Sequence, residues 1–144
     1  MIQDLYKLLI RLHKESDKPF SGLGLLICSD TTKIPIYPLY RSTVHLCGTD
    51  LFEQLSELSS LQNTHHDGFH VISQKLEITH IAQYFYPNPV LGMSIDANKH
   101  YGARYFVAKI GSTIPEVLYS AVVGTSYGVC IFKNGQELLD FKND

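Results

Sequence analysis

GLGLLIC, which runs from Gly22 to Cys28, is the stretch that decides the fold of this chain. It is an uninterrupted apolar run between a preceding serine and the polar pair Ser29-Asp30, and it is too short to cross a membrane. A run of this kind predicts a strand that is buried on both faces, as occurs where helices cover both sides of a sheet.

Helical spacing of apolar residues is seen on both sides of this strand. The N-terminal segment alternates leucines and isoleucine with charged residues in the pattern of an amphipathic helix that packs on the domain. Asp50 and Glu53 form a capping-box pattern before the leucine-rich helix, and Gly111 marks the end of a third helix that follows a loop at residues 92–98. The predicted helices cover residues 2–15, Leu51–Leu61 and His100–Ile110.

The other strands are predicted from β-branched and aromatic runs that are bounded by turn residues. Thr31 to Arg41 contains Pro35 and Pro38, so it is predicted to be an edge strand or an irregular connection. Asn134-Gly135 is a hairpin signal. The predicted strands are Phe69–Ser73, Leu76–Tyr86, Val117–Val123, Val129–Phe132 and Leu138–Phe141. One domain over residues 1–144 therefore mixes at least five strands with about three helices.

Charge and cysteine content exclude several classes of protein. The net charge is −2 and Lys and Arg form no run, which argues against general nucleic-acid binding but leaves room for a small anionic ligand. No segment is apolar enough to predict membrane insertion. The widely spaced Cys28, Cys47 and Cys130 indicate buried thiols in a reducing compartment. These features predict a cytoplasmic protein that binds no membrane.

A histidine-rich stretch offers one candidate for a metal site. His65, His66, Asp67 and His70 supply nitrogen and carboxylate donors. If a strand starts at Phe69, however, the three imidazoles cannot all point the same way. Solvated or hydrogen-bonded histidines are the more common outcome for such a pattern.

A second candidate pairs Asp67-Gly68 with Gly102–Arg104. An aspartate in a turn before a strand can bind a metal or a ribose hydroxyl, and an arginine at a helix start adds a cation to the backbone N–H groups that attract phosphate. Taken alone, the two segments are more often a turn aspartate and a solvated arginine than a binding site.

Over almost the whole chain, the sequence resembles the diadenylate cyclase domain. The matching elements, in the same order, are Leu23–Cys28, the helix near Leu51–Leu61, His66–Ile72, Ile78–Pro87, Tyr101–Arg104 and the hairpin Leu118–Leu138. That family has a "DGA" motif, then "G-T-R-H-R" at the start of a helix that ends in "G-I-S-E"; the counterparts here read DGF, GARYF and KIGST. The resemblance implies a twisted mixed central sheet of about six to seven strands flanked by helices on both sides, with an adenine nucleotide held between the two motifs. In active members two domains face each other and convert two ATP to cyclic di-AMP.

The resemblance carries roles to individual residues. Asp67 matches the aspartate that helps to bind a divalent metal, Mg²⁺ or Mn²⁺, and activates the attacking hydroxyl. Gly68 matches the glycine that allows close approach of the nucleotide, and Gly102 and Arg104 match part of the phosphate-binding motif. The full set of nucleotide-binding residues implied in this way is Asp67, Gly68, Phe69, Gly102, Ala103, Arg104, Tyr105, Ser112 and Thr113.

The departures from the family pattern bear on catalysis. Ala103, Tyr105, Phe106 and Thr113 replace a threonine, a histidine, a second arginine and an acidic residue, which removes charge stabilisation that phosphoryl transfer needs. Phe69 and Phe106 are predicted to fill the core or, alternatively, to line the pocket, and Glu116 is a weak substitute for the missing acid because Pro115 precedes it.

Three functional hypotheses remain. The first is a catalytically weak or inactive domain that binds an adenine nucleotide or a linear or cyclic dinucleotide as a sensor or interaction module, with a second copy or another protein as partner. The second is an active, divergent diadenylate cyclase that uses Asp67, a metal and replacement groups such as His66 or His70. The third is an oligomerisation scaffold whose pocket is filled by Phe69 and Phe106.

Overall fold

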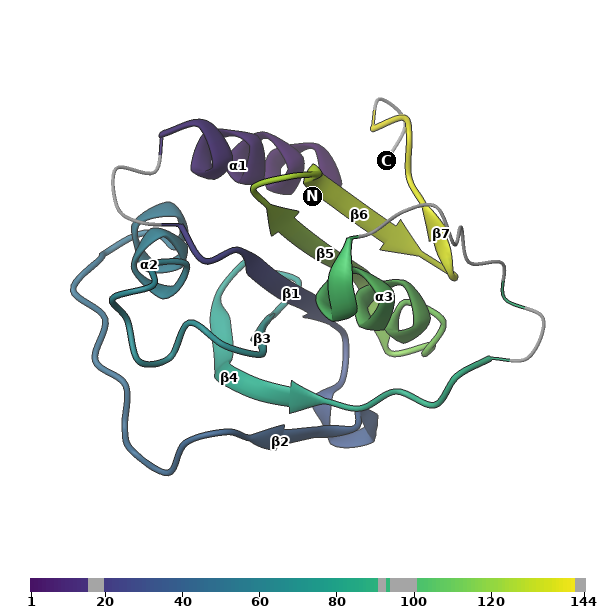
Figure 1. The fold of residues 1–144 in the computed structure, drawn as a ribbon. Coiled ribbons are helices and arrows are strands. Elements are labelled where there is room, and N and C mark those ends of the chain that lie inside the picture. Colours follow the sequence, from purple (N-terminus) through teal and green to yellow (C-terminus); the bar gives the residue numbers. More distant parts are fainter. Residues whose placement is uncertain (16–19, 91–92, 94–100, 142–144) are drawn as a thin grey trace.

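A computed structural model describes residues 1–15, 20–90, 93 and 101–141. Within these residues one seven-stranded mixed sheet is flanked by helices (Figure 1), which confirms the predicted fold class. In chain order the elements are α1 (Ile2–Glu15), β1 (Leu23–Cys28), a 3-10 turn η1 (Thr31–Lys33), β2 (Ile36–Pro38), α2 (Leu51–Leu58), β3 (Phe69–Ile72), β4 (Ile78–Phe85), α3 (Gly102–Gly111), β5 (Val117–Gly124), β6 (Gly128–Lys133) and β7 (Gln136–Glu137).

Strand β1 lies in the middle of the sheet, whose order is β2-β4-β3-β1-β5-β6-β7. It pairs in parallel with β3, with Leu25 opposite His70, and antiparallel with β5, with Leu23 opposite Val123. The starts of β1 and β3 and the end of β5 therefore lie at the same edge of the sheet. The parallel pair requires a long crossover, and α2 lies within that connection.

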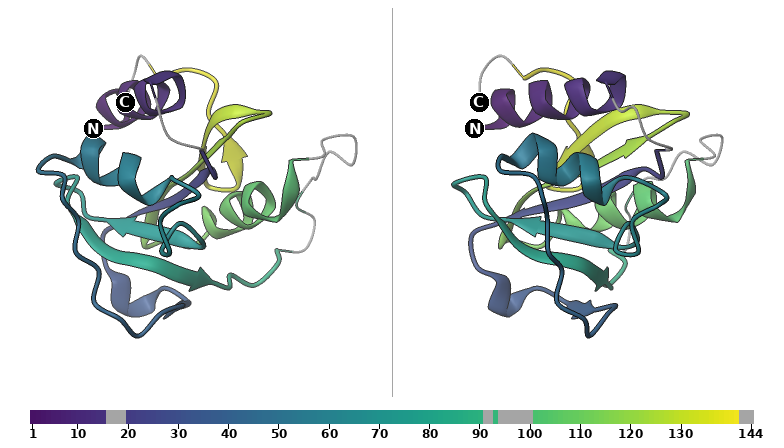
Figure 2. Two further views of the ribbon diagram at one scale, coloured as in Figure 1. Left: turned by 60° about the vertical axis from the view of Figure 1, so that its left-hand side comes forward. Right: turned by 90° about the vertical axis from the view of Figure 1, so that its left-hand side faces the viewer.

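Side chains of β1 alternate between two apolar clusters, one on each face of the sheet. Leu23, Leu25 and Ile27 pack with the buried faces of α1 and α2. Leu26 and Cys28 belong to the other cluster, with Ala108 of α3. Figure 2 shows α1 and α2 on one side of the sheet and α3 on the other. All six residues of β1 are buried, as predicted for a strand covered on both faces.

Several predicted boundaries are corrected by the structure. Helix α2 ends at Leu58 rather than Leu61, because Ser59 and Ser60 turn to meet the segment before β1: the Ser21 N–H donates to the Ser59 carbonyl at 2.7 Å. Strand β4 begins at Ile78 rather than Leu76, since Leu76 has a φ of 60° in the turn. The predicted helix at His100–Ile110 is found from Gly102, and His100 and most of the loop predicted at 92–98 lie outside the described residues.

The C-terminal prediction is only partly right. Asn134 and Gly135 both have positive φ, 52° and 80°, which is the hairpin turn expected there. The strand that follows is β7 at Gln136–Glu137, and no strand is found at Leu138–Phe141. The chain leaves the sheet after Leu138, and the ring of Phe141 stacks on Tyr6 of α1 with 4.1 Å between centroids.

Edge and cysteine predictions have mixed outcomes. β2 is an edge strand, as expected from its prolines. Cys28 and Cys130 are buried free thiols, and burial raises the pKa of Cys28 to about 12. Cys47, predicted to be buried, is exposed because it lies in the loop before α2, where its N–H donates to the Glu57 carboxylate at 3.0 Å.

Candidate functional site

The two predicted segments meet at the edge where β1 and β3 begin. Asp67-Gly68 directly precedes β3, and Arg104 lies in the first turn of α3. Nη2 of Arg104 donates to the carbonyl oxygen of His66 at 3.4 Å, although the two residues are 38 positions apart. The negative charge of Asp67 also acts on Arg104. The structure therefore brings the aspartate turn and the α3 start together.

Two glycines make room for this approach. Gly22, at the start of β1, has a φ of 96°, and a Cβ at this position would lie 2.7 Å from Nη1 of Arg104. Gly68 has a φ of 75°, and a Cβ there would overlap the backbone carbonyl of Gln83 in β4. Glycine is needed at both positions because the conformation is left-handed and no space is left for a side chain.

Arg104 is a partly buried cation with few acceptors. Burial lowers the pKa of its guanidinium, and the nearby Tyr127 and Asp67 raise it; at neutral pH the group is charged. A guanidinium has five N–H donors, and among the described residues the acceptor for Arg104 is the His66 carbonyl, at a long 3.4 Å. An arginine in this state favours an anionic ligand that supplies the missing acceptors.

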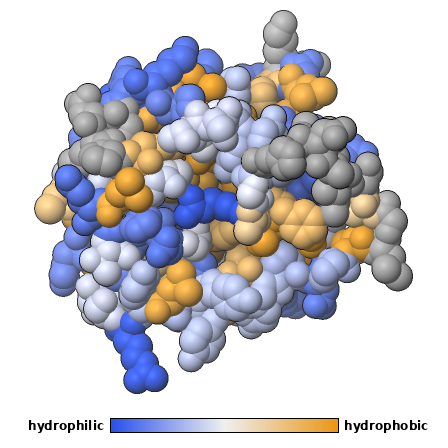
Figure 3. All heavy atoms as spheres, viewed as in Figure 1, coloured by the Kyte–Doolittle hydropathy of each residue, from blue (hydrophilic) through white to orange (hydrophobic). Residues whose placement is uncertain are grey.

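Among the described residues, the start of α3 is left uncovered beside Arg104. The N-cap residue Tyr101 makes no side-chain capping bond, and no described residue lies within 4 Å of a Cβ at Gly102, whose φ is 85°. The first N–H groups of a helix carry partial positive charge and attract anions. Figure 3 shows strongly hydrophilic atoms in a hollow near the centre of this face, beside paler and apolar side chains.

Asp67 is exposed and has two polar neighbours. Its Oδ2 accepts a hydrogen bond from the Tyr40 hydroxyl at 3.4 Å, and its Oδ1 lies 3.5 Å from Nδ1 of His66. Despite this closeness, the buried Nδ1 of His66 makes no hydrogen bond of acceptable geometry. The carboxylate can accept ligand hydroxyl groups on its exposed side.

His70 has a structural role that the sequence did not suggest. Ala82 forms a bulge in β4, with a φ of 52°, and its N–H donates to Nδ1 of His70 at 3.0 Å. Burial lowers the pKa of His70 to about 3, with a further contribution from Arg104, so the ring is neutral. Since Nδ1 is an acceptor, the proton lies on Nε2, a buried donor for which the described part of the chain supplies no acceptor.

The histidines are not gathered around one point. His65 packs edge-on to Tyr40 and its Nε2 lies 3.3 Å from the Ser42 hydroxyl, while His70 faces β4. Among the described residues, no three His, Cys, Asp or Glu side chains are placed to hold a metal together. Asp67 is the one carboxylate beside Arg104 to which the resemblance assigns a metal-binding role.

Tyr105, Phe69 and Phe106 have surroundings that differ from those of Arg104 and Asp67. The hydroxyl of Tyr105 donates to Glu137 at 2.8 Å and its ring packs against Phe132, so its side chain is turned toward β6 and β7. Phe69 is 5% exposed and packs on Phe85 in the core under α3. Phe106, in contrast, is 37% exposed. The two phenylalanines therefore do not jointly fill one pocket, and Ala103 is exposed.

Ser112 and Thr113 lie at the far end of α3 from Arg104. Ser112 is the C-cap of α3 and lies eight positions after Arg104, a rise of about 12 Å along the helix. The Ser112 hydroxyl donates to the Lys109 carbonyl and accepts from the Gly135 N–H at 2.8 Å, while the Thr113 hydroxyl donates to the Ile110 carbonyl. Both side chains satisfy backbone groups of the helix end and the hairpin. The geometry does not bring them, or the following Glu116, to the α3 start.

Gly22, Tyr40 and Tyr127 also lie beside Arg104 or Asp67, and the sequence did not predict them as site residues. The ring of Tyr127 covers Gly124, whose Cβ would lie 2.5 Å from it, and the tyrosine lies near enough to Arg104 to raise the pKa of the guanidinium. Tyrosine 127 also packs near Tyr101 and Tyr105, with centroids 4.9 and 5.7 Å away. The sequence pattern that could have indicated Tyr127 is the segment Gly124–Gly128, a turn in which this tyrosine lies between two glycines.

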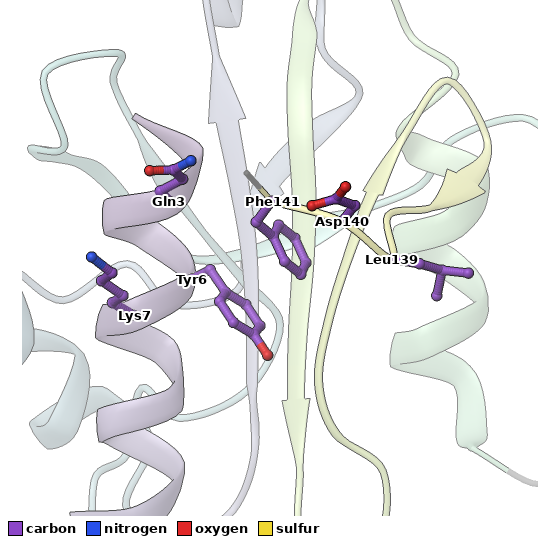
Figure 4. A pocket seen from close by; sticks show the side chains of 6 residues that line it. All are labelled: Gln3, Tyr6, Lys7, Leu139, Asp140 and Phe141. Atoms are coloured by element: carbon purple, nitrogen blue, oxygen red, sulfur yellow. The ribbon is translucent and has the colours of Figure 1, made fainter. Parts of the chain in front are cut away.

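A second hollow lies between α1 and the C-terminal segment. It has a volume of about 400 Å³ and is lined by Gln3, Tyr6, Lys7, Leu139, Asp140 and Phe141 (Figure 4). Its main feature is the stacked pair Tyr6 and Phe141. We interpret this pair as the contact that fastens the C-terminal segment to α1.

Comparisons with known proteins give a fold relationship. No family model matches the chain, and no curated protein matches it. The structure is similar to the crystal structure of a hypothetical membrane spanning protein from Bacillus cereus, with a TM-score of 0.68 and 16% sequence identity. The similarity covers 94% of this chain and 61% of the other, so the chain spans less than two thirds of that protein.

The comparison contradicts one prediction. A cytoplasmic location was expected from the sequence, whereas the similar protein is described as membrane spanning. In the described part of this chain, no helix has the length and apolar character required to cross a bilayer.

Proposed function

We propose that this chain is a diadenylate-cyclase-like domain that binds an adenine nucleotide or dinucleotide and has little or no cyclase activity. The observation that carries the proposal is the partly buried Arg104, short of acceptors and next to the aspartate turn and the open α3 start. These are the residues to which the sequence resemblance assigns nucleotide binding.

Weak catalysis is supported by what has replaced the catalytic residues. Tyr105 stands where the family has a histidine, and its hydroxyl is engaged by Glu137. Phe106 stands where the family has a second arginine, and it cannot neutralise phosphate charge. Arg104 is thus left to act without the cationic neighbours that stabilise the transition state of phosphoryl transfer. Binding requires less than this, because one charge-assisted contact and backbone donors can hold an anion.

The test is a ligand screen on the purified chain. Thermal melting and calorimetry are run with ATP, AMP and cyclic di-AMP, and with GTP and cyclic di-GMP as base controls. A ligand that binds the folded state raises the melting temperature, and we expect this from at least one adenine compound.

Two arginine variants make the test specific. Arg104→Gln should abolish the shift, whereas Arg41→Gln, at an exposed arginine, should preserve it. If no adenine compound binds, or if Arg104→Gln binds as well as the unmodified chain, the proposal is wrong.

A further inference from the structure

Building on the proposed nucleotide-binding function, we propose that Arg104 receives a singly charged phosphodiester, as in a dinucleotide, and that this ligand binds without a divalent metal. The proposal concerns the charge of the ligand, which the adenine assignment leaves open. It rests on the charges and hydrogen-bond donors that surround Arg104.

The first argument is the balance of charge. In the described part of the chain, the charged groups shown to act on one another at this edge are Arg104 and Asp67, which together sum to zero. Each phosphodiester group carries one negative charge, and the guanidinium can pair directly with one such group; ApA has one of these groups and cyclic di-AMP has two. A triphosphate adds about four negative charges, and charge that is removed from water without a partner is costly.

The second argument is the kind of donors that Arg104 has beside it. The first N–H groups of α3 are uncapped by any side chain of Tyr101, and they are neutral donors. His70 is neutral, because burial lowers its pKa and its Nδ1 accepts from the Ala82 N–H, so it adds no second cation beside Arg104. One cation and several neutral donors suit a monoanion better than a polyanion.

The third argument concerns the metal that a triphosphate would bring. Magnesium is usually held by one or two carboxylates together with substrate phosphates. Here Asp67 is the assigned carboxylate, one of its oxygens accepts from Tyr40, and the other faces a ring nitrogen of His66. Arg104 acts on the same carboxylate and competes with a second cation. This donor set gives a metal–triphosphate complex little support.

Calorimetry on the full chain separates the two kinds of ligand. The probes are the dinucleoside monophosphate ApA, cyclic di-AMP and ATP, each measured with excess Mg²⁺ and with EDTA. We expect one or both diesters to bind at least about tenfold more tightly than ATP under both conditions, and EDTA to leave diester binding unchanged. Arg104→Gln should weaken the diester by about tenfold to a hundredfold, the range for a lost charged hydrogen bond, while Arg41→Gln should not.

The possible results distinguish this proposal from the broader one. Tighter binding of Mg²⁺–ATP, or loss of diester binding in EDTA, overturns the inference and leaves adenine-nucleotide binding intact. Diester binding that is unaffected by Arg104→Gln overturns the role of Arg104. Absence of binding by every probe overturns both proposals. The ligand comparison uses the unmodified chain, so it decides the question even if Arg104→Gln fails to fold.

Discussion

The glycines of the candidate site allow a paired test of how the fold is held at this edge. Gly68 and Gly102 both have a positive φ, 75° and 85°. They differ in space: a Cβ at Gly68 would overlap the backbone carbonyl of Gln83 and lie 2.8 Å from Cδ1 of Leu39, whereas no atom of the described residues lies within 4 Å of a Cβ at Gly102. The substitutions Gly68→Ala and Gly102→Ala therefore share the conformational cost and differ in the steric one.

The expected magnitudes follow from these two contributions. An alanine in the left-handed region costs about 1–2 kcal/mol, and the loss of freedom in the unfolded chain returns about 0.4–1 kcal/mol at either site. Overpacking against backbone adds about 1–3 kcal/mol at Gly68. Gly102→Ala should thus lower the free energy of unfolding by about 1 kcal/mol, and Gly68→Ala by about 2–4 kcal/mol.

Urea denaturation of both variants without ligand measures the difference. The denaturation midpoint should fall further for Gly68→Ala, with the slope of the unfolding free energy unchanged in both. Equal losses in the two variants would refute the reasoning, because they would mean that the carbonyl of Gln83 does not confine Gly68. A loss at Gly102 greater than at Gly68 would contradict the open surroundings of the α3 start.

Three further predictions concern the neighbouring residues. The pKa of His70 is lowered to about 3 in the folded state from 6.5, so the unfolded chain takes up a proton first as the pH falls, and the free energy of unfolding should decline below about pH 6.5 by up to about 1.4 kcal/mol per pH unit. His70→Gln should flatten this slope, whereas His45→Gln, at an exposed histidine, should not. A slope that is unchanged in His70→Gln would show that another group titrates. Tyr105→Phe removes the 2.8 Å hydrogen bond to Glu137 and should lower the free energy of unfolding, measured by thermal unfolding, by about 1 kcal/mol. Tyr37→Phe, at a side chain that is 66% exposed, should change it by no more than about 0.5 kcal/mol. Equal effects in the two variants would mean that the contact with Glu137 contributes nothing to stability. With ATP and Mn²⁺, chromatography should detect no cyclic di-AMP, and product that disappears in Asp67→Asn would instead establish an active cyclase.

Local sequence patterns predicted most of the secondary structure correctly. The buried strand β1, the amphipathic α1 and the capped start of α2 were predicted because their signals lie within a few residues: an apolar run, a helical repeat, and Asp50 accepting from the Glu53 N–H at 2.8 Å. The predictions were wrong where contacts between residues far apart in the sequence override the local pattern. The end of α2 is set by contact with Ser21, and the course of Phe141 by stacking on Tyr6.

The predicted residues of the candidate site also fall into two groups, those that the structure brings together and those that it does not. The sequence identified Asp67, Gly68, Gly102 and Arg104 as one group, and the structure brings these residues to one edge. It also grouped Ser112 and Thr113 with them, and these side chains bond instead to the far end of α3 and the hairpin. Motif order along a chain gives no information on which end of a helix faces a ligand.

The sequence by itself determined most of the strands and helices, and which of their faces are apolar, because periodicity and turn chemistry are properties of neighbouring residues. Only the tertiary structure decided that Gly22 and Tyr127 lie beside Arg104, that His70 accepts a hydrogen bond from the bulge at Ala82, and that Arg104 donates to the His66 carbonyl. These facts depend on strand order and on the crossover between β1 and β3. Contacts between residues that are dozens of positions apart are fixed by the packing of whole elements, and no local pattern encodes them.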